Sequence, residues 1–454
     1  MLFNSYAFLL FFLPITLLAY HSLPGPRSRL ILLLAASWFF YAWWSLSFSF
    51  LILGFCAVNF WVAGLIHGSE SPGPRRAWMI FLVTLDLGVL AFFKYYALIV
   101  QAFGAIHVAV PRLDIALPIG ISFYTFQGVS YALDLYRRKI PPAPDLARFT
   151  LFKLFFPQLI AGPIVRYGQI GSQLGALRSD YAMFAKGIFF FVSGLAKKMI
   201  LADAMARIAD GAFSGNYAGI DAYFGLVAFA FQIYFDFSAY SEMAYGLGYM
   251  FGVELPQNFN SPYKSKSLTE FWKRWHITLS QWLRDYLYIP LGGNRNGKTR
   301  MYLALVVTML LGGLWHGASY TFIIWGLMHG TLLVMEKALG SRNPLLRLPG
   351  WVQVVVTFHL VMAAWVFFRC HSFAQATQYF SGLFSWTTFA PVHLATRDVV
   401  EILICIPIIW LLPNLFQIPF RLGWAQVSWS LACLILGLAV MFGSHPTPFL
   451  YFQF

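Results

Sequence analysis

The hydrophobic residues of this chain fall in long apolar blocks, separated by short connections that carry proline, glycine and basic residues. The first block, Leu2 to Tyr20, has no basic segment before it and no small-x-small cleavage pattern, so it predicts a spanning helix rather than a removed signal peptide. Leu30 to Ile66 is nearly twice the roughly 20 residues that cross a bilayer, and it therefore predicts two helices that turn near Trp44 to Ser47. The other blocks that predict membrane helices are Ala77 to Gly104, Ile115 to Leu135, Tyr181 to Ala204, Ala222 to Val253, Tyr302 to Met335, Trp351 to Phe368, Val399 to Leu412 and Trp429 to Phe442.

These blocks predict an all-α, polytopic transmembrane protein with about ten to thirteen membrane segments, some of them re-entrant. Of the 454 residues, 59% are hydrophobic and 11% are charged, whereas soluble proteins carry roughly 25% charged residues. There is no internal repeat and no linker long enough to separate soluble domains. We therefore expect residues 1–454 to form a single multi-pass domain.

The basic residues lie mainly in the connections, so the net charge of +14 reports membrane orientation rather than a nucleic-acid partner. Arg27 and Arg29 follow the first crossing, and each of the next two clusters, Arg75 with Arg76 and then Arg137 to Lys139, follows a further pair of crossings. The positive-inside rule places all these clusters in the cytoplasm. The amino terminus is then expected to be extracytoplasmic.

One apolar block, Phe149 to Tyr167, is interrupted by Pro157, Gly162 and Pro163. Proline removes a backbone donor, and irregular backbone at membrane depth survives only where protein or a water-filled cavity satisfies it. The block predicts a re-entrant or kinked element that lines a cavity. The alternative is an amphipathic turn that lies on the membrane surface.

Several charged side chains fall inside predicted helices, among them Asp86, Lys94, Asp236 and Glu242. Asp86 and Lys94 are expected to face a polar pocket or to reach the interface. Asp236 and Glu242 are six residues apart, which does not place them on one helical face, so a paired acid and base is not predicted. We expect each of these carboxylates to bond to neighbouring hydroxyls or to an arginine across the bundle.

The most polar part of the chain, Pro256 to Arg300, is expected to face the cytoplasm. Aromatic and apolar residues recur in it at helical spacing and predict one interfacial helix. Such a helix would either anchor the protein or form a basic, aromatic-rimmed mouth for an anionic cytoplasmic donor, and His276 belongs to this mouth. The residues that share the predicted face are Phe271, Trp275, Leu279, Trp282 and Tyr286.

The stretch LGGLWHGASY places His316 inside an apolar run whose other histidine is His329. Burial disfavours the charged form of an imidazole, so we expect a mostly neutral side chain that can accept a proton. If the helix is unbroken, His316 lies roughly 24 Å along its axis from Arg300. The alternative is a packing histidine bonded to a neighbouring carbonyl. Small residues that would allow close approach are Gly312, Gly313 and Gly317.

The four cysteines, Cys56, Cys370, Cys405 and Cys433, stand singly in apolar surroundings without ligand-type spacing. We interpret them as small hydrophobic residues. The sequence therefore predicts no disulfide, no metal site and no tightly bound cofactor.

Several stretches together resemble the membrane-bound O-acyltransferases, with the bacterial branch that O-acetylates exported polysaccharides such as alginate as the nearest likeness. The stretches occur in the same order from the amino-terminal MLFNSYAFLLFFLP to the last residue. They are FFPQLIAGPIVRY, YFDFSAYSEMAYGLG, FWKRWHITLSQWLRDYLYIPLGGNR, GGLWHGASYTFIIWGLMHG and PFLYFQF.

The resemblance implies a multi-pass fold whose helices surround a central funnel, open to the cytoplasm. His316 matches the family's catalytic histidine, and His276 matches its second motif histidine near the donor path. The implied donor is acetyl-CoA or an acylated carrier, and the implied acceptor is a polysaccharide or an extracytoplasmic acetyltransferase partner, in the bacterial cytoplasmic (inner) membrane. We take as candidate residues of the substrate tunnel Trp315, Gly317, Trp275, Asp236, Tyr240, Pro157, Gln158, Asn258 and Arg284.

The chemistry of the residues agrees with this resemblance. A neutral imidazole at His316 could take the proton of a hydroxyl as it attacks a thioester, which typically contributes about 10²- to 10⁴-fold. A serine nucleophile is not indicated, since GASYT lacks the G-x-S-x-G pattern. The competing hypotheses are a D-alanyl-type transferase of the same family, a transporter or flippase with an intramembrane polar path, and a scaffold for an export complex.

Overall fold

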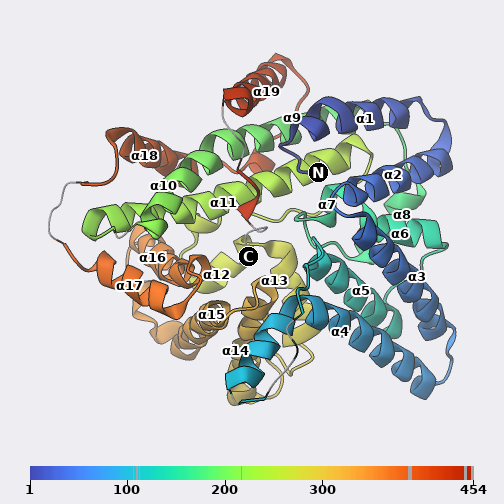
Figure 1. Cartoon of the computed structure of the whole chain (residues 1–454), viewed down its shortest axis with the longest axis horizontal. Coiled ribbons are helices and arrows are strands. Elements are labelled where there is room, and N and C mark those ends of the chain that lie inside the picture. Colours follow the sequence, from blue (N-terminus) through green and yellow to red (C-terminus); the bar gives the residue numbers. More distant parts are fainter. Residues whose placement is uncertain are drawn as a thin grey trace. The chain divides into compact units, whose positions relative to one another are not determined.

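The computed structural model describes residues 1–105, 107–108, 111, 113–215, 217–386, 391–443 and 447–450. Every regular element within these residues is a helix (Figure 1), which confirms the all-α prediction. Seven helical segments are long and apolar enough to cross a bilayer, and the chain is a multi-pass membrane protein. These segments are α3 (Leu46–Gly68), α4 (Pro72–Ala105), α11 (Gly219–Met250), α15 with η5 (Tyr320–Arg342), α16 (Gly350–Arg369), α18 with η7 (Thr396–Gln417) and α19 (Trp424–Gly443).

The helices form two compact units. The first unit comprises Met1–Leu195, Tyr240–Pro256 and Phe420–Ile435, and the second comprises Ala196–Ala239, Gln257–Pro419 and Leu436–Phe454. The long helices α11 and α19 contribute residues to both. Both histidines that the sequence singles out, His276 and His316, belong to the second unit. The remaining α-helices are α1 (Leu13–Ser22), α2 (Gly25–Ala42), α5 (Ile121–Tyr136), α6 (Leu146–Leu154), α7 (Phe156–Leu159), α8 (Tyr167–Gly175), α9 (Tyr181–Ala196), α10 (Asp203–Ser214), α12 (Leu268–Arg274), α13 (Ile277–Leu283), α14 (Gly297–His316) and α17 (Phe373–Leu383).

The turn predicted near Trp44 to Ser47 is confirmed. Helix α2 ends at Ala42 and α3 begins at Leu46. Ser45 ends the turn as an N-cap, because its hydroxyl accepts a hydrogen bond from the Phe48 N–H at 3.4 Å. One otherwise unpaired donor at the start of α3 is thereby satisfied.

The helix expected over Ile115 to Leu135 begins later than predicted. The structure starts α5 at Ile121, after Gly120, which has a φ of +76° and accepts no Cβ without a clash against the Leu159 carbonyl. Left-handed backbone at this position separates the preceding non-helical residues from the helix. The element is 16 residues long and almost entirely buried, so it is a core helix of the first unit.

The broken element between Phe149 and Tyr167 is confirmed. Helix α6 ends at Leu154, and the short α7 begins after Phe155 with Pro157 in its first turn. All side chains of α7 are buried. The alternative of a surface-lying turn is therefore wrong.

The predicted polar surroundings of Asp86 are confirmed within the first unit. Lys153 Nζ donates to Asn59 Oδ1 at 2.8 Å, and Asn59 Nδ2 donates to Asp86 Oδ1 at 2.8 Å. All three side chains are fully buried. Gly128 makes room for them, because a Cβ there would clash with Asp86 and lie 2.8 Å from Lys153 Nζ. Charges at this depth need such partners.

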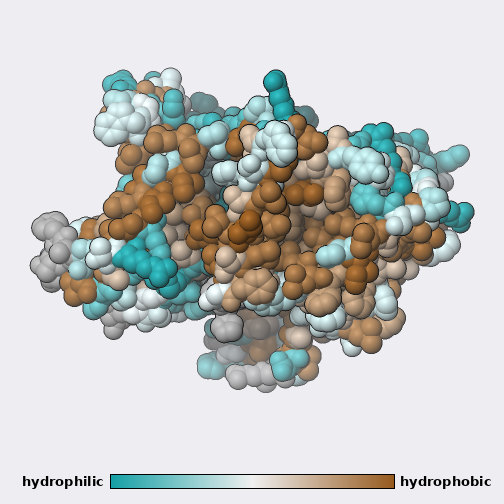
Figure 2. Space-filling view, turned by 90° about the horizontal axis from the view of Figure 1, so that it is seen from above, coloured by the Kyte–Doolittle hydropathy of each residue, from teal (hydrophilic) through white to brown (hydrophobic). Residues whose placement is uncertain are grey.

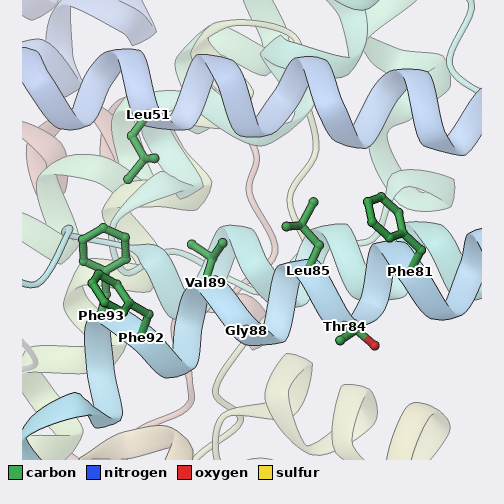
Figure 3. Close-up of a pocket in the computed structure, with 8 residues that line it drawn as sticks. All are labelled: Leu51, Phe81, Thr84, Leu85, Gly88, Val89, Phe92 and Phe93. Atoms are coloured by element: carbon green, nitrogen blue, oxygen red, sulfur yellow. The ribbon is translucent and has the colours of Figure 1, made fainter. Parts of the chain in front are cut away.

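Apolar side chains cover much of the visible surface (Figure 2), as the membrane location requires. In the first unit, a groove of about 590 Å³ lies between α3 and α4. Its walls carry no ionisable side chain, and Gly88 leaves an open notch in α4 (Figure 3). The groove therefore offers no ionisable acid or base. Its lining residues are Leu51, Phe81, Thr84, Leu85, Gly88, Val89, Phe92 and Phe93.

The prediction of a single interfacial helix between Phe271 and Tyr286 is wrong. The structure divides it into α12, α13 and a short π-helix, with His276 at the break in a left-handed conformation, φ 41°. Backbone bonds hold the break open: Asn260 N–H donates to the Arg274 carbonyl, and Ile277 N–H donates to the Asn258 carbonyl, both at 2.9 Å. The five residues of the predicted face are buried inside the protein.

Helices α14 and α15 form a hairpin in which the backbones touch. A Cβ at Gly313 would clash with the Phe322 carbonyl oxygen, and a Cβ at Gly326 would lie 2.5 Å from the Met309 carbonyl oxygen. Such close approach through glycine is typical of membrane helix pairs. It fixes the end of α14, which is His316, against α15.

We expect Gly326→Ala to destabilise the protein by about 1–3 kcal/mol, because backbone atoms of α14 cannot move away from the new methyl group without displacing the helix. Thermal unfolding of the purified protein in detergent measures the change. Gly88→Ala is the matched control, because nothing lies within 4 Å of a Cβ there. A melting temperature for Gly326→Ala equal to that of the control would contradict the packing argument.

Candidate active site

His316 is the last residue of α14 and is 6% exposed. The helix ends there because Gly317 is extended and Ser319 caps the next helix, its hydroxyl accepting from the Thr321 N–H at 3.1 Å. Gly317 is required, since a Cβ would clash with the ring of Phe322. The imidazole is thus held at a sharp turn between two helices rather than in the middle of one.

Aromatic rings surround His316 on several sides. The centroid of its ring lies 5.0 Å from that of Trp315, 5.1 Å from Trp325 and 5.2 Å from Phe368. All three contacts are edge-on. Packing of this kind limits the access of water to the imidazole.

His276 is fully buried and its tautomer is determined by its partner. Its Nδ1 lies 3.0 Å from Asn258 Oδ1, which also accepts from the Thr278 hydroxyl at 2.9 Å. Because that oxygen can only accept, Nδ1 carries the proton and Nε2 bears the lone pair. Within the described residues, Nε2 has no hydrogen-bond partner. Burial lowers the pKa of His276 to about 3, so the ring is uncharged near neutral pH.

The two histidines share one neighbour. Trp315 lies 6.0 Å from the His276 ring and 5.0 Å from the His316 ring, measured between centroids. The resemblance that joins these residues in sequence is therefore matched by their proximity in the second unit. Asn258, a candidate tunnel residue, acts on His276 directly through its hydrogen bond.

A cavity of about 340 Å³ opens in the second unit between α12, α13, α14 and α15. Its walls contain three cations and no carboxylate. Arg284, predicted as a tunnel residue, is one of these cations and is paired with Asp285 at 2.6 Å. The lining residues are Thr269, Trp272, Lys273, Ile277, Ser280, Gln281, Leu283, Arg284, Tyr288, Leu305, Thr308, Met309, Leu333 and Lys337.

Two tryptophans lie between the cavity and His316. His316 does not line it, but Trp272 does, and the rings of Trp272 and Trp325 lie 5.8 Å apart. Trp325 in turn contacts His316. A basic, mostly apolar cavity is therefore separated from the candidate base by two ring contacts.

Asp236 has a structural partner that the sequence did not indicate. Its Oδ1 lies 2.8 Å from Lys198 Nζ, a lysine rather than the hydroxyls or arginine expected. Its Oδ2 accepts from the Leu450 N–H at 2.7 Å, and Lys198 also contacts Asp203 and Thr447. These buried bonds hold the carboxyl-terminal residues in the second unit.

The anchored carboxyl-terminal residues pack against a phenylalanine that contacts His276. Phe449, next to the anchored Leu450, packs its ring 5.7 Å from Phe237, and Phe237 lies 4.7 Å from the His276 ring. The terminal PFLYFQF motif is thus a packing element as far as Leu450. Tyr451 to Phe454 lie outside the described residues.

Other candidate residues of the tunnel pack against neighbours within their own units. Trp275 is buried in the core of the second unit, where its ring packs between Phe271 and Trp365. Other candidates belong to the first unit, where Gln158 donates to the Phe152 carbonyl and Tyr240 stacks on Phe3. A tunnel role for the first-unit candidates, Pro157, Gln158 and Tyr240, stays a prediction.

Sequence reasoning missed two residues of this region. Trp325 packs against His316, and His329 lies 4.8 Å from Trp325. Their spacing of four residues on a predicted helix places them on one face. The available signal for these two residues was a histidine in an apolar run, four residues after a tryptophan.

Comparisons with known proteins identify related sequences. Residues 132–376 match the model of the membrane-bound O-acyltransferase family. A probable alginate O-acetylase AlgI of Pseudomonas aeruginosa is 45% identical over 86% of this chain and 76% of its own length. A peptidoglycan O-acetyltransferase of Helicobacter pylori is 34% identical over 100% and 98%. A teichoic acid D-alanyltransferase of Bacillus subtilis is 29% identical over 54% and 66%.

The pKa of His276 gives a pH prediction. The native ring has a pKa of about 3, below its ordinary value of 6.5, so the unfolded chain binds a proton that the native protein excludes. The contribution of His276 to the free energy of unfolding is therefore fully present above about pH 6.5, and it is lost as the pH falls towards 3. Between pH 7.5 and 5.0, we expect His276 to account for a loss of roughly 2 kcal/mol.

Thermal unfolding in detergent at these two pH values measures the effect. The melting temperature of His276→Gln should fall less between pH 7.5 and 5.0 than that of the wild type. Equal decreases in the two proteins would show that His276 titrates normally in the folded state.

Proposed function

This chain belongs to the membrane-bound O-acyltransferase family and is an acyltransferase, and from this premise we propose that it moves an acetyl group across the membrane for O-acetylation of an exported polysaccharide. The observation that supports the proposal most directly is the pair of buried histidines, His276 and His316, which share Trp315 beside a basic cavity. We further propose that the two units act as one membrane domain over residues 1–454.

The donor in this proposal is a cytoplasmic thioester, acetyl-CoA or an acetylated carrier. The cavity lined by Lys273, Arg284 and Lys337 suits it, because cations at the mouth attract the donor's phosphates while the apolar walls accept its uncharged arm. Lys337 is held at the mouth by Asn294 Oδ1, to which its ammonium donates at 3.1 Å. This placement supports the predicted cytoplasmic orientation of the loop.

His316 acts as the general base. Its neutral imidazole takes the proton of the acceptor hydroxyl as the oxygen attacks the thioester carbonyl, and the thiolate leaves from the tetrahedral intermediate. The negative charge on that intermediate needs nearby N–H donors, for which the indole of Trp315 is a candidate. His276, fixed by Asn258, packs 6.0 Å from Trp315 between ring centroids and acts through it.

The acceptor lies on the extracytoplasmic side in this proposal. It is a polysaccharide hydroxyl or a partner acetyltransferase that passes the group on. The protein resides in the bacterial inner membrane with an extracytoplasmic amino terminus, as the basic connections suggest. An acetyl rather than a D-alanyl group is favoured because the teichoic acid relative matches only 54% of this chain, against 86% for the alginate relative.

The central test is His316→Ala. We expect polysaccharide acetylation in cells to fall by at least about a hundredfold, because the hydroxyl then loses its base. Transfer from labelled acetyl-CoA by the purified protein and its native partner should fall equally. As a control, His316→Ala and the wild type should show equal expression and equal melting temperatures. Acetylation at the wild-type rate in a folded variant would refute the catalytic role and favour a scaffold or transporter.

A second test concerns the cations of the cavity. We expect Lys273→Gln with Lys337→Gln to raise the KM for acetyl-CoA about tenfold while kcat changes little, since the cations bind phosphates distant from the reaction. The difference should shrink at high salt. Arg397→Gln removes an exposed cation paired with Glu401 and serves as the control. A fall in kcat with unchanged KM would contradict this placement of the donor.

A further inference from the structure

His329 is a buried histidine that the proposed mechanism does not use. It is 0% exposed, and neither ring nitrogen has a hydrogen-bond partner within the part of the chain that the structure describes. A buried polar group without a partner typically costs about 1–3 kcal/mol. Such a group in a native protein needs an explanation, and a ligand is one.

The rings around His329 share this property. Trp272 and Trp325 lie 5.2 Å and 4.8 Å from it, and both indole Nε1 atoms are buried without a partner among the described residues. A neutral imidazole offers one N–H and one lone pair, and each indole offers one N–H. The cluster therefore presents three donors and one acceptor. A secondary amide complements it, with a carbonyl oxygen that accepts and an N–H that donates.

The position of the cluster on α15 connects the cavity to the catalytic base. One face of this helix carries four residues at a spacing of four, Trp325, His329, Leu333 and Lys337. Leu333 and Lys337 line the cavity, whereas Trp325 contacts His316. From Lys337 to Trp325, the helix rises roughly 18 Å. His329 is therefore on the line from the cationic mouth to His316, one turn beyond the cavity wall.

The opposite wall follows the same course on α14. Leu305, Thr308 and Met309 line the cavity, and the next turns of that helix lead to Gly312 and then to His316. Gly312 has no side chain, and a Cβ there would lie 3.2 Å from the Leu283 side chain. Two helices thus guide an extended chain towards the base.

We propose that His329, with the indole N–H groups of Trp272 and Trp325, binds the secondary amide of the donor's pantetheine arm and positions the thioester at His316. The inference rests on the proposed thioester donor. It assigns His329 as a positioning residue that recognises the arm, which CoA and a phosphopantetheinylated carrier have in common. The phosphates are bound separately, at the cationic mouth.

The test compares probes with and without the arm. Binding of CoA, of a phosphopantetheinylated carrier protein and of adenosine 3′,5′-bisphosphate, which lacks the arm, is measured by calorimetry on the purified protein. We expect His329→Phe to weaken binding of the arm-bearing probe about tenfold or more, and to leave the bisphosphate unchanged. His329→Gln, which keeps a donor and an acceptor, should recover part of the loss. Whichever arm-bearing probe the wild type binds identifies the donor.

His359→Phe is the matched control, because it makes the same replacement in the same unit. The ring nitrogens of His359 are both occupied, Nδ1 by the Val355 carbonyl at 2.8 Å and Nε2 by the Tyr223 hydroxyl at 2.9 Å. The control should leave the ratio of CoA to bisphosphate binding unchanged. His329→Phe should melt no lower than the wild type, since it removes two unpaired buried nitrogens.

Two results would overturn the inference. The first is an unchanged ratio of arm-bearing to bisphosphate binding in His329→Phe, or in His329→Leu if the phenylalanine variant does not fold. The second is a wild type that binds neither arm-bearing probe, which would also refute the proposed donor. Loss of acetylation in His316→Ala combined with an unchanged ratio for His329→Phe would leave the proposed function standing and reject only this inference.

Discussion

The direct contact between the backbones of α14 and α15 is the constraint on which the candidate site depends. In a membrane, apolar helices gain little by leaving lipid for each other, so association relies on close packing. Glycine supplies it here: a Cβ at Gly330 would lie 3.0 Å from Val306 Cα, and one at Gly326 would lie 3.0 Å from Leu310 Cα. His316, at the end of one helix, is thereby set against Trp325 on the other.

Buried polar groups in this protein differ in the partners that their side chains have. Asp86 and Asp236 are bonded to side chains distant in sequence, and their charges are compensated where they lie. These groups fix the packing of their own units. His276 and His329 retain ring nitrogens without a partner in the described part of the chain. An unpaired buried nitrogen lowers the stability of the folded protein. Such nitrogens are expected where a substrate completes the hydrogen bonding.

Much of the architecture was predictable because apolar length decides what can span a bilayer. The turn before Leu46 and the break near Pro157 both follow from local sequence. The break at His276 does not, since a non-glycine residue with φ of 41° is held there by bonds to a distant segment. The pairing of Lys198 with Asp236 is equally hidden, because 38 residues separate two groups whose meeting depends on tertiary packing.

The chemistry requires two environments that conflict. An imidazole that accepts a proton from a hydroxyl works best where water is excluded, whereas a phosphate-bearing donor is stable only beside water and cations. A single pocket cannot offer both. The face of α15 resolves the conflict by distance, with Lys337 at the mouth and Trp325 against His316 three turns away. Only an uncharged arm can occupy the turns between them. In the proposed function, the separation of charge from reaction along one helix favours thioesters carried on long neutral chains over small charged acyl donors such as acetyl phosphate.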